Sequence, residues 1–371
     1  MRLIHLTTSG GWGGREMYPL ALAENQARRG HTVSVVAKRN TPLAERLSGS
    51  GLDHDLLRVG PYFDPAACLA LARVIRRRNP DILHLHLSRD LLLAHLACLA
   101  SGRKPTVILH KHIASAGNKR DPLHRWLFGR TEAVVAVSEF VRTSLLNSCP
   151  VGSEKVKVIF NGVDPARFTA DVDSQARTRL RREIGAESPA AVVAGVVGRV
   201  ELRKGQEWFV EAAGLLAGSH PELRFAIAGA PEGDYDQVLR KRIEALGLSG
   251  RVTLLGHRPD PRTLYGSLDI LAVPSWEEAF GLAAVEGMLC GLPVVASDSG
   301  ALPEFIQEGV NGFLVPLKDT RALAGVIGRL ADDPELRRKT GLRARQWAQE
   351  HLGLNVILDR LDRLYEECAQ K

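Results

Sequence analysis

The sequence lacks the features that mark secreted, membrane-spanning and disulfide-bonded proteins. Its five cysteines are an odd, scattered set without a Cys-x-x-Cys pair, which argues against a disulfide framework and favours a reducing compartment. No apolar run reaches the roughly 18–20 residues that cross a bilayer. The first residues resemble a strand and a glycine-rich loop rather than a signal peptide. We therefore expect a cytoplasmic protein.

Acidic residues are scarce in the first half of the chain. Residues 1–168 hold 24 Lys and Arg against 13 Asp and Glu, a charge of +11, and the remainder carries −4, which together give the net +7. A basic half suits an anionic partner, so we expect peripheral contact with an anionic membrane or glycolipid. Aromatic residues make up only 5% of the chain. Because no aromatic-rich basic strand suits single-stranded nucleic acid, no nucleic-acid partner is expected.

Short apolar runs alternate with helical patterns along all 371 residues, which predicts an α/β protein with parallel sheets and two domains. The expected domains are 1–165 and 166–351. The expected strands are 3–6, 33–37, 82–86, 107–109, 133–137, 191–197, 224–228, 252–255, 269–273, 294–296 and 313–315. In the first half the expected helices are 15–29, 65–78, 90–101, 122–128 and 139–147.

Residues 275–288 carry the most informative pattern. Glu278 and Glu286 bracket a Phe-Gly-Leu turn that leads from a strand, closed by Pro274, into an apolar helix. The start of a helix presents backbone N–H groups and a positive dipole end to an anion, and Gly281 allows the anion to approach closely. Glu278 could accept hydrogen bonds from hydroxyls on one side of a bound phosphate, and Glu286 could hold a ribose diol on the other. This predicts a nucleotide-sugar ligand.

The Glu-x7-Glu spacing and the segments after it resemble the retaining glycosyltransferases of family 4, which have the GT-B fold. The matching segments are 274–288, 291–297, 303–306 and 309–315. The resemblance implies two facing Rossmann-like domains, a hinge at residues 161–164, and a last helix, 352–371, that packs back on the first domain. It also implies an enzyme that transfers a hexose from a nucleoside diphosphate sugar to a glycan or glycolipid, and we favour bacterial polysaccharide or lipopolysaccharide synthesis.

The resemblance assigns further residues to the donor site. Arg199 and Lys204 follow the first strand of the second domain, where they would neutralise the departing diphosphate. Phe280, Gly281 and Leu282 would lie at the phosphate, and Arg258 lies in a loop expected near the base. No cofactor or metal is implied. Asp171-Val172-Asp173 has the spelling of a metal-binding Asp-x-Asp, but helix capping explains it better.

The first glycine-rich loop contains Gly13 and Gly14 between a strand and a helix. It is not a dinucleotide fingerprint, because Glu16 stands where the third glycine belongs. The resemblance places Gly13 and Gly14 at the cleft between donor and acceptor. Ser138 has two open interpretations, a helix N-cap or a residue bordering the acceptor.

Histidines gather at the ends of two first-domain strands. The resemblance implies one histidine that touches the reacting sugar, and both His110 and His112 are candidates, with His112 favoured. His84 and His86 lie on one side of a strand and could bind a metal, but the sequence shows no evident third ligand, so a hydrogen-bonded role is favoured.

One other enzyme class would fit the same donor site. A nucleotide-sugar epimerase of GT-B architecture would bind the diphosphate but would need no acceptor. A double-displacement hydrolase is not favoured, because no second carboxylate offers itself as nucleophile or acid across a glycosidic bond.

Overall fold

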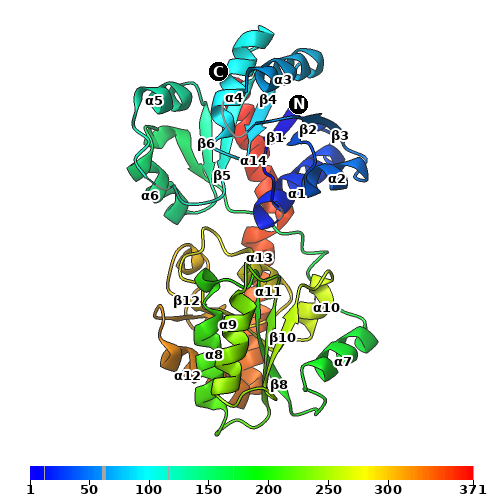
Figure 1. Ribbon diagram of the computed structural model, residues 1–371, viewed down its shortest axis with the longest axis vertical. Helices are drawn as coiled ribbons and strands as arrows, with labels where there is room; N and C mark the ends of the chain where they lie inside the picture. Colours follow the sequence, from blue (N-terminus) through cyan, green and yellow to red (C-terminus); the bar gives the residue numbers. More distant parts are fainter. Residues whose placement is uncertain (12, 61–63, 116, 170, 371) are drawn as a thin grey trace. The chain divides into compact units, whose positions relative to one another are not determined.

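The computed structural model describes residues 1–11, 13–60, 64–115, 117–169 and 171–370, which form two compact units (Figure 1). The first unit comprises Met1–Asn161 and Ile357–Lys371, and the second comprises Gly162–Val356. The sequence placed this boundary after residue 165. No described helix combines the length and apolar character needed to cross a membrane.

The described part of the first unit is built on a seven-stranded parallel sheet with the order β3-β2-β1-β4-β5-β6-β7. Its strands are β1 (Arg2–Thr7), β2 (Thr32–Lys38), β3 (Asp53–Leu57), β4 (Ile82–Leu85), β5 (Thr106–Lys111), β6 (Ala133–Ala136) and β7 (Val156–Val158). Its helices are α1 (Gly14–Arg28), α2 (Pro42–Ser48), α3 (Pro65–Arg78), α4 (Asp90–Ser101), α5 (Pro122–Gly129), α6 (Glu139–Ser148) and, from residue 357 onward, α14 (Leu354–Ala369).

Local sequence explains where several of these helices begin. Thr41, Asp64 and Asp121 each precede a proline and accept a hydrogen bond from a backbone N–H in the first turn of α2, α3 and α5. Ser138 caps α6 in the same way, accepting from the N–H of Val141 at 3.1 Å. The capping interpretation of Ser138 is therefore confirmed.

The described part of the second unit contains a six-stranded parallel sheet with the order β10-β9-β8-β11-β12-β13. Its strands are β8 (Val192–Val197), β9 (Leu223–Ala228), β10 (Val252–Gly256), β11 (Ile270–Val273), β12 (Val294–Ser297) and β13 (Phe313–Val315). Its helices are α7 (Ser174–Glu183), α8 (Gln206–Leu216), α9 (Tyr235–Ala245), α10 (Pro261–Gly266), α11 (Leu282–Leu289), α12 (Thr320–Asp332) and α13 (Pro334–Leu352).

The sequence reading overlooked β3 and α2. The strand β3 begins Asp53-His54-Asp55, which does not read as an apolar run. It nevertheless pairs with β2, and its carboxylates bind the end of α3: Arg77 lies 2.5 Å from Asp55 and Arg78 lies 2.6 Å from Asp53. The polar side chains of β3 thus make ion pairs to α3 at the surface, while backbone pairing with β2 holds the strand in the sheet.

Candidate active site

Loops of the second unit gather at the carboxyl edge of its sheet. Strand β8 lies between β9 and β11, so the chain leaves β8 toward one side of the sheet and leaves β11 toward the other. In open α/β sheets, ligands bind in the crevice outside such a reversal of strand order. The predicted donor residues lie in the two loops that begin there, 198–205 and 274–281.

An ion pair joins these two loops. The Nζ of Lys204 lies 2.5 Å from Oε1 of Glu278, and the hydroxyl of Ser275 donates to the same oxygen at 2.8 Å. The two charged side chains are 28% and 13% exposed, so solvent and ligands can still reach the pair. The structure therefore brings together a cation and a carboxylate that sequence spacing could only suggest.

Two glycines allow close packing here, Gly205 between the two loops and Gly300, which follows β12, against the backbone of Glu278. At Gly205, with φ 69°, an added Cβ would lie 1.9 Å from the carbonyl oxygen of Pro274. At Gly300, with φ 61°, it would lie 2.4 Å from the carbonyl oxygen of Glu278. Since neither the backbone conformation nor the space admits a side chain, both positions require glycine.

Helix α11 begins beside the ion pair. Gly281 precedes it in the left-handed conformation, with φ 94°, and Phe280 is buried with its ring 5.6 Å from that of Phe305. Leu282, the first helical residue, is half-buried. The first backbone N–H groups of a helix have no partner within it, so this end can receive an anion.

Glu286 lies farther along α11 and has an outside partner. The hydroxyl of Tyr265, in α10, donates to Oε2 of Glu286 at 2.6 Å. Loss of hydration raises the pKa of the Glu286 carboxyl to about 7, although the bond from Tyr265 and the charge of Arg167 act in the opposite direction. Sequence reasoning missed Tyr265, because the residue lies 21 positions before its partner and in another helix.

Arg199 and Arg258 have different surroundings. The Arg199 side chain is exposed and near enough to Glu201 to favour its ionised form, although burial and a hydrogen bond with Glu232 raise the pKa of Glu201. Arg258 forms an ion pair with Glu183 of α7 and donates to the carbonyl oxygen of Leu255 at 3.0 Å. Arg258 thus contacts α7 at the edge of the sheet.

A tryptophan pair that sequence reasoning missed flanks the second loop. Trp208 and Trp276 stack with their ring centroids 5.5 Å apart, and Nζ of Lys318 lies 4.4 Å from the Trp276 ring. The backbone N–H of Trp276 donates to the carbonyl oxygen of Arg203 at 2.8 Å. The pair therefore fixes the path of the loop that carries Glu278.

The predicted histidines lie together in the first unit. The rings of His110 and His112 stack with centroids 4.4 Å apart, and Nε2 of His112 lies 3.1 Å from Nδ1 of His86. His84 and His86 also stack, at 4.6 Å. The favoured hydrogen-bonded role is confirmed, because His84 bonds to Tyr365 and His86 to His112. A third histidine that the sequence did not make evident also lies beside both: His5 of β1, the direct register partner of His84.

The remaining predicted residues have simpler settings. Gly13 has φ −177°, an extended conformation open to any residue, and it precedes α1, which begins at Gly14. Asp173 caps α7 by accepting from the N–H groups of Gln175 and Ala176. The capping interpretation of Asp171-Val172-Asp173 is confirmed at Asp173.

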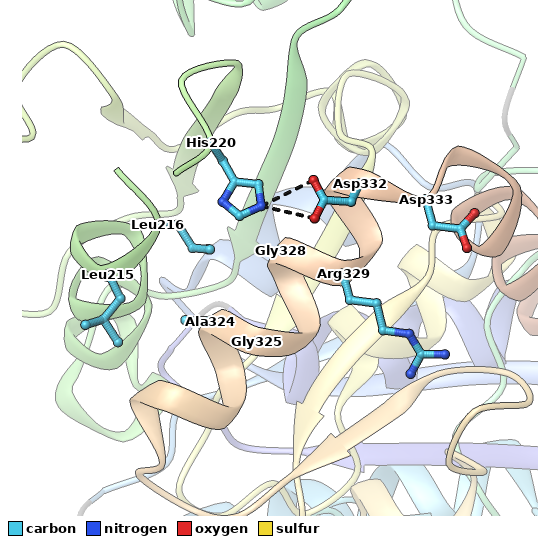
Figure 2. A pocket seen from close by; sticks show the side chains of 9 residues that line it. All are labelled: Leu215, Leu216, His220, Ala324, Gly325, Gly328, Arg329, Asp332 and Asp333. Carbon is cyan, nitrogen blue, oxygen red and sulfur yellow. Dashed lines mark hydrogen bonds and ion pairs between the residues drawn. The ribbon is translucent and has the colours of Figure 1, made fainter. Parts of the chain in front are cut away.

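A groove of about 440 Å³ lies elsewhere on the second unit, along α8 and α12 (Figure 2). His220 faces Asp332 there, with Nε2 3.3 Å from Oδ1. The groove is lined by Leu215, Leu216, His220, Ala324, Gly325, Gly328, Arg329, Asp332 and Asp333. None of the predicted site residues is among them, so the groove is separate from the candidate active site.

Comparison with known families matches both units. Residues 178–347 match the family described as glycosyl transferases group 1, and residues 12–167 match glycosyltransferase family 4. The lipopolysaccharide core biosynthesis mannosyltransferase LpcC of Rhizobium leguminosarum bv. viciae is 32% identical over 323 residues, which cover 84% of this chain and 83% of that protein. D-inositol 3-phosphate glycosyltransferase of Corynebacterium jeikeium is 28% identical, over 97% and 93% of the two chains.

Solved structures share the fold. The crystal structure of Anabaena Alr3699/HepE in complex with UDP and glucose has a TM-score of 0.82 and 25% identity, over 98% of this chain and 99% of that chain. A glycosyltransferase from Rickettsia africae has a TM-score of 0.90 and 22% identity, over 99% and 98%. With two parallel sheets in the chain, these likenesses confirm the expected GT-B fold.

Proposed function

Because this chain belongs to glycosyltransferase family 4 and is a sugar-transferring enzyme, we propose that it moves a hexose from a nucleoside diphosphate sugar to a hydroxyl of a glycan or glycolipid. The anomeric configuration is retained in this proposal. The observation that carries it is the Lys204–Glu278–Ser275 cluster beside the start of α11, at the strand-order reversal of the second sheet.

The proposed donor site follows the charges around that cluster. Lys204, Arg199 and the backbone N–H groups around Gly281 would bind the diphosphate, whose negative charge increases as the sugar leaves. Glu278 would accept hydrogen bonds from the hexose hydroxyls and Glu286 from the ribose diol. The structure of HepE with UDP and glucose supports a donor of this class.

The proposed reaction occurs on one face of the sugar. The bond from the anomeric carbon to the diphosphate oxygen breaks as the acceptor oxygen forms its bond on the same face. The acceptor proton passes to the departing phosphate oxygen, and the nucleoside diphosphate leaves. We assign orientation of the hexose to His112, and neutralisation of the leaving group to Lys204 and Arg199 rather than to a metal ion.

The proposed acceptor class follows from one relative and from the charge of the first half of the chain. The relation to LpcC, a lipopolysaccharide core biosynthesis mannosyltransferase, supports an acceptor in cell-surface polysaccharide or lipopolysaccharide synthesis. The +11 charge of residues 1–168 suits an anionic glycolipid or an anionic membrane surface.

A donor screen followed by product analysis tests the proposal. Thermal shifts with UDP, GDP and ADP sugars identify the donor, since a ligand that binds only the native state raises its melting temperature. NMR of the reaction with and without acceptor then gives the product. We expect a glycoside with the donor's anomeric configuration. An altered sugar formed without acceptor would indicate an epimerase, and an inverted glycoside would contradict retention.

A further inference from the structure

Five of the buried histidines in the described part of the first unit lie together: His5, His84, His86, His110 and His112. They come from β1 and from the carboxyl ends of β4 and β5, three neighbouring strands of the sheet. His5 and His84 are direct partners in the pairing of β1 with β4. One ring nitrogen from each of His5, His84 and His86 lies within 4.8 Å of the other two.

Each of these three rings is held by an outer partner through one nitrogen. His5 Nε2 lies 2.7 Å from Oε1 of Gln26, His84 Nδ1 lies 2.6 Å from the Tyr365 hydroxyl, and His86 Nδ1 lies 3.1 Å from His112 Nε2. Metal-bound histidines are held in this way, with the second nitrogen of the ring fixed by a hydrogen bond. The ring nitrogens without an outer partner of this kind are His5 Nδ1, His84 Nε2 and His86 Nε2.

The inner nitrogens are poorly satisfied by the protein alone. His5 Nδ1 and His86 Nε2 lie 2.9 Å apart and share one hydrogen bond, whereas the buried His84 Nε2 has no hydrogen-bond partner. Burial lowers the pKa of all three rings, that of His5 to about 4, so the rings are neutral and can act as ligands. A buried, unpaired ring nitrogen is unfavourable, and coordination would remove that defect.

We propose that His5, His84 and His86 form a binding site for a transition-metal ion that prefers imidazole, of which Zn²⁺ is the representative. Three histidines with an open fourth position are an established zinc arrangement, while Mg²⁺ and Ca²⁺ require oxygen ligands that these residues do not provide. The group His86, His110 and His112 also places nitrogens within 4.8 Å. It is the weaker set, because neither ring nitrogen of His110 has an outer partner to orient it.

Metal binding at this site would also change the tautomer of His112, and the importance of that change for catalysis rests on the proposed function of His112. Without metal, His5 donates to Gln26, so His86 Nε2 donates to His5 and His112 Nε2 donates to His86. A metal on His86 Nε2 moves the His86 proton to Nδ1, which then donates to His112 Nε2. His112 would therefore exchange its tautomer when the ion binds.

Metal binding is tested on the full chain, prepared without an affinity tag of histidines and freed of metal by chelation. We expect one Zn²⁺ per chain by elemental analysis after dialysis, and a melting temperature about 5–10 °C higher with Zn²⁺ at a hundredfold excess over its Kd. Mg²⁺ should give no rise. Co²⁺ should give the visible absorption of a tetrahedral site with nitrogen ligands.

Variants assign the binding to this cluster. His84→Gln should lose the bound ion and the Zn²⁺-induced thermal shift, whereas His351→Gln, which replaces an exposed histidine of the second unit, should keep both. The wild-type Co²⁺ spectrum remains decisive should His84→Gln not fold. No retained Zn²⁺ and no thermal shift in the wild type would overturn the site, as would equal binding by His84→Gln.

The outcome is separable from the proposed transfer reaction. Loss of the metal site would leave the thermal shift caused by a nucleoside diphosphate in place. If Zn²⁺ binds, the ¹⁵N shifts of the His112 ring should report a proton moved from Nε2 to Nδ1, and an unchanged tautomer would contradict the link to His112.

Discussion

The ammonium group of Lys204 has two competing partners in the proposed reaction, Glu278 and the diphosphate of the donor. Replacing Lys204 by Ala should lower kcat/KM for the donor by about 10²-fold or more, because a charge that stabilises the leaving group is lost. The melting temperature should change little, since a partly exposed ion pair contributes about 0–1 kcal/mol. Steady-state kinetics at varied donor concentration measure the effect.

Arg203→Ala is the matched control for Lys204. The side chain of Arg203 is exposed in the same short loop, and its backbone carbonyl oxygen, which the substitution keeps, accepts a hydrogen bond from Trp276. Its kinetics should stay within about twofold of wild type, as surface changes away from a site usually have small effects. Wild-type kinetics for Lys204→Ala would refute the assignment of the diphosphate to this residue.

The buried Glu286 carboxylate should lower the stability of the protein at neutral and higher pH, although it is proposed to bind the ribose of the donor. Its pKa rises from 4.5 to about 7 on folding, so the folded state binds the proton more tightly, and stability is lost progressively as pH rises from about 4.5 to about 7. Glu286→Gln should therefore be more stable than wild type at pH 8, by up to about 3 kcal/mol, and nearly equal to it at pH 4. Urea unfolding at both pH values measures the difference.

The same variant should use the donor poorly. Glu286→Gln retains one acceptor oxygen but loses the charge proposed to hold the ribose diol, so we expect KM for the donor to rise about tenfold or more. Glu277→Gln, an exposed change in the preceding loop, should alter neither property. Unchanged stability at pH 8 would contradict the raised pKa, whereas unchanged KM would contradict the ribose contact.

The sequence indicated site residues through motifs but could not supply their partners. The loops after β8 and β11 were identifiable, and the structure adds that Lys204 meets Glu278. Tyr265 and Trp208 could not be found, because each acts through a residue far away in the chain. His5 was missed for the same reason, since only the register of β1 with β4 places it beside His84.

At the scale of elements, the close packing of the loops after β8 and β11 depends on Gly205. An alanine there would adopt an unfavourable positive φ, and its Cβ would overlap the carbonyl oxygen of Pro274. Gly205→Ala should destabilise the second unit by more than about 2 kcal/mol and displace the Lys204 loop. Thermal unfolding and donor titration measure the two effects.

Gly325→Ala provides the contrasting change within a helix of the same unit. Its Cβ would meet no atom within 4 Å, and alanine favours the helical conformation, so a gain of about 0.5–1 kcal/mol is expected. Because Gly325 lines the groove of Figure 2 and not the candidate active site, activity should be unchanged. Equal stability of the two glycine variants would contradict this account of the loops.

Helices and strands with a strong apolar sequence pattern could be predicted, whereas short or polar ones could not. The strands expected at 33–37 and 294–296 correspond to β2 and β12, whose buried residues are mostly valine and alanine. β3 is defined by its pairing with β2 and carries aspartates that pair with Arg77 and Arg78 of α3, so its own sequence carries little apolar signal. α2 was missed although Thr41 and Pro42 mark its start, because it is a single short helix.

At the scale of the whole molecule, the proposed chemistry should be independent of Mg²⁺ and Mn²⁺. Transfer should continue after treatment with EDTA, because Lys204, Arg199 and the start of α11 supply the positive charge near the diphosphate. Activity assays with EDTA, with and without added ions, measure this. Loss of activity that Mg²⁺ or Mn²⁺ restores would contradict it, whereas a loss restored only by Zn²⁺ would point to the histidine cluster.

The GT-B fold and the family could be inferred from the sequence, because the strand–loop–helix series and the segments around 274–315 are local signals. The substrate's identity could not be inferred in the same way. Backbone groups at a helix start bind any phosphate, so the residues at Gly281 carry no information about the base or the sugar.

Helix α14 gives the molecule a constraint on its biosynthesis. Tyr365 reaches His84 and Gln26, and Arg29 pairs with Asp359 at 2.7 Å, so the first unit is completed by residues that leave the ribosome after the whole of the second unit. The intervening residues 162–356 have all been translated by then. A nascent chain halted before residue 357 would contain all of the second unit, whereas the first unit would still lack helix α14. The first unit, although its synthesis begins earlier, would therefore finish folding later.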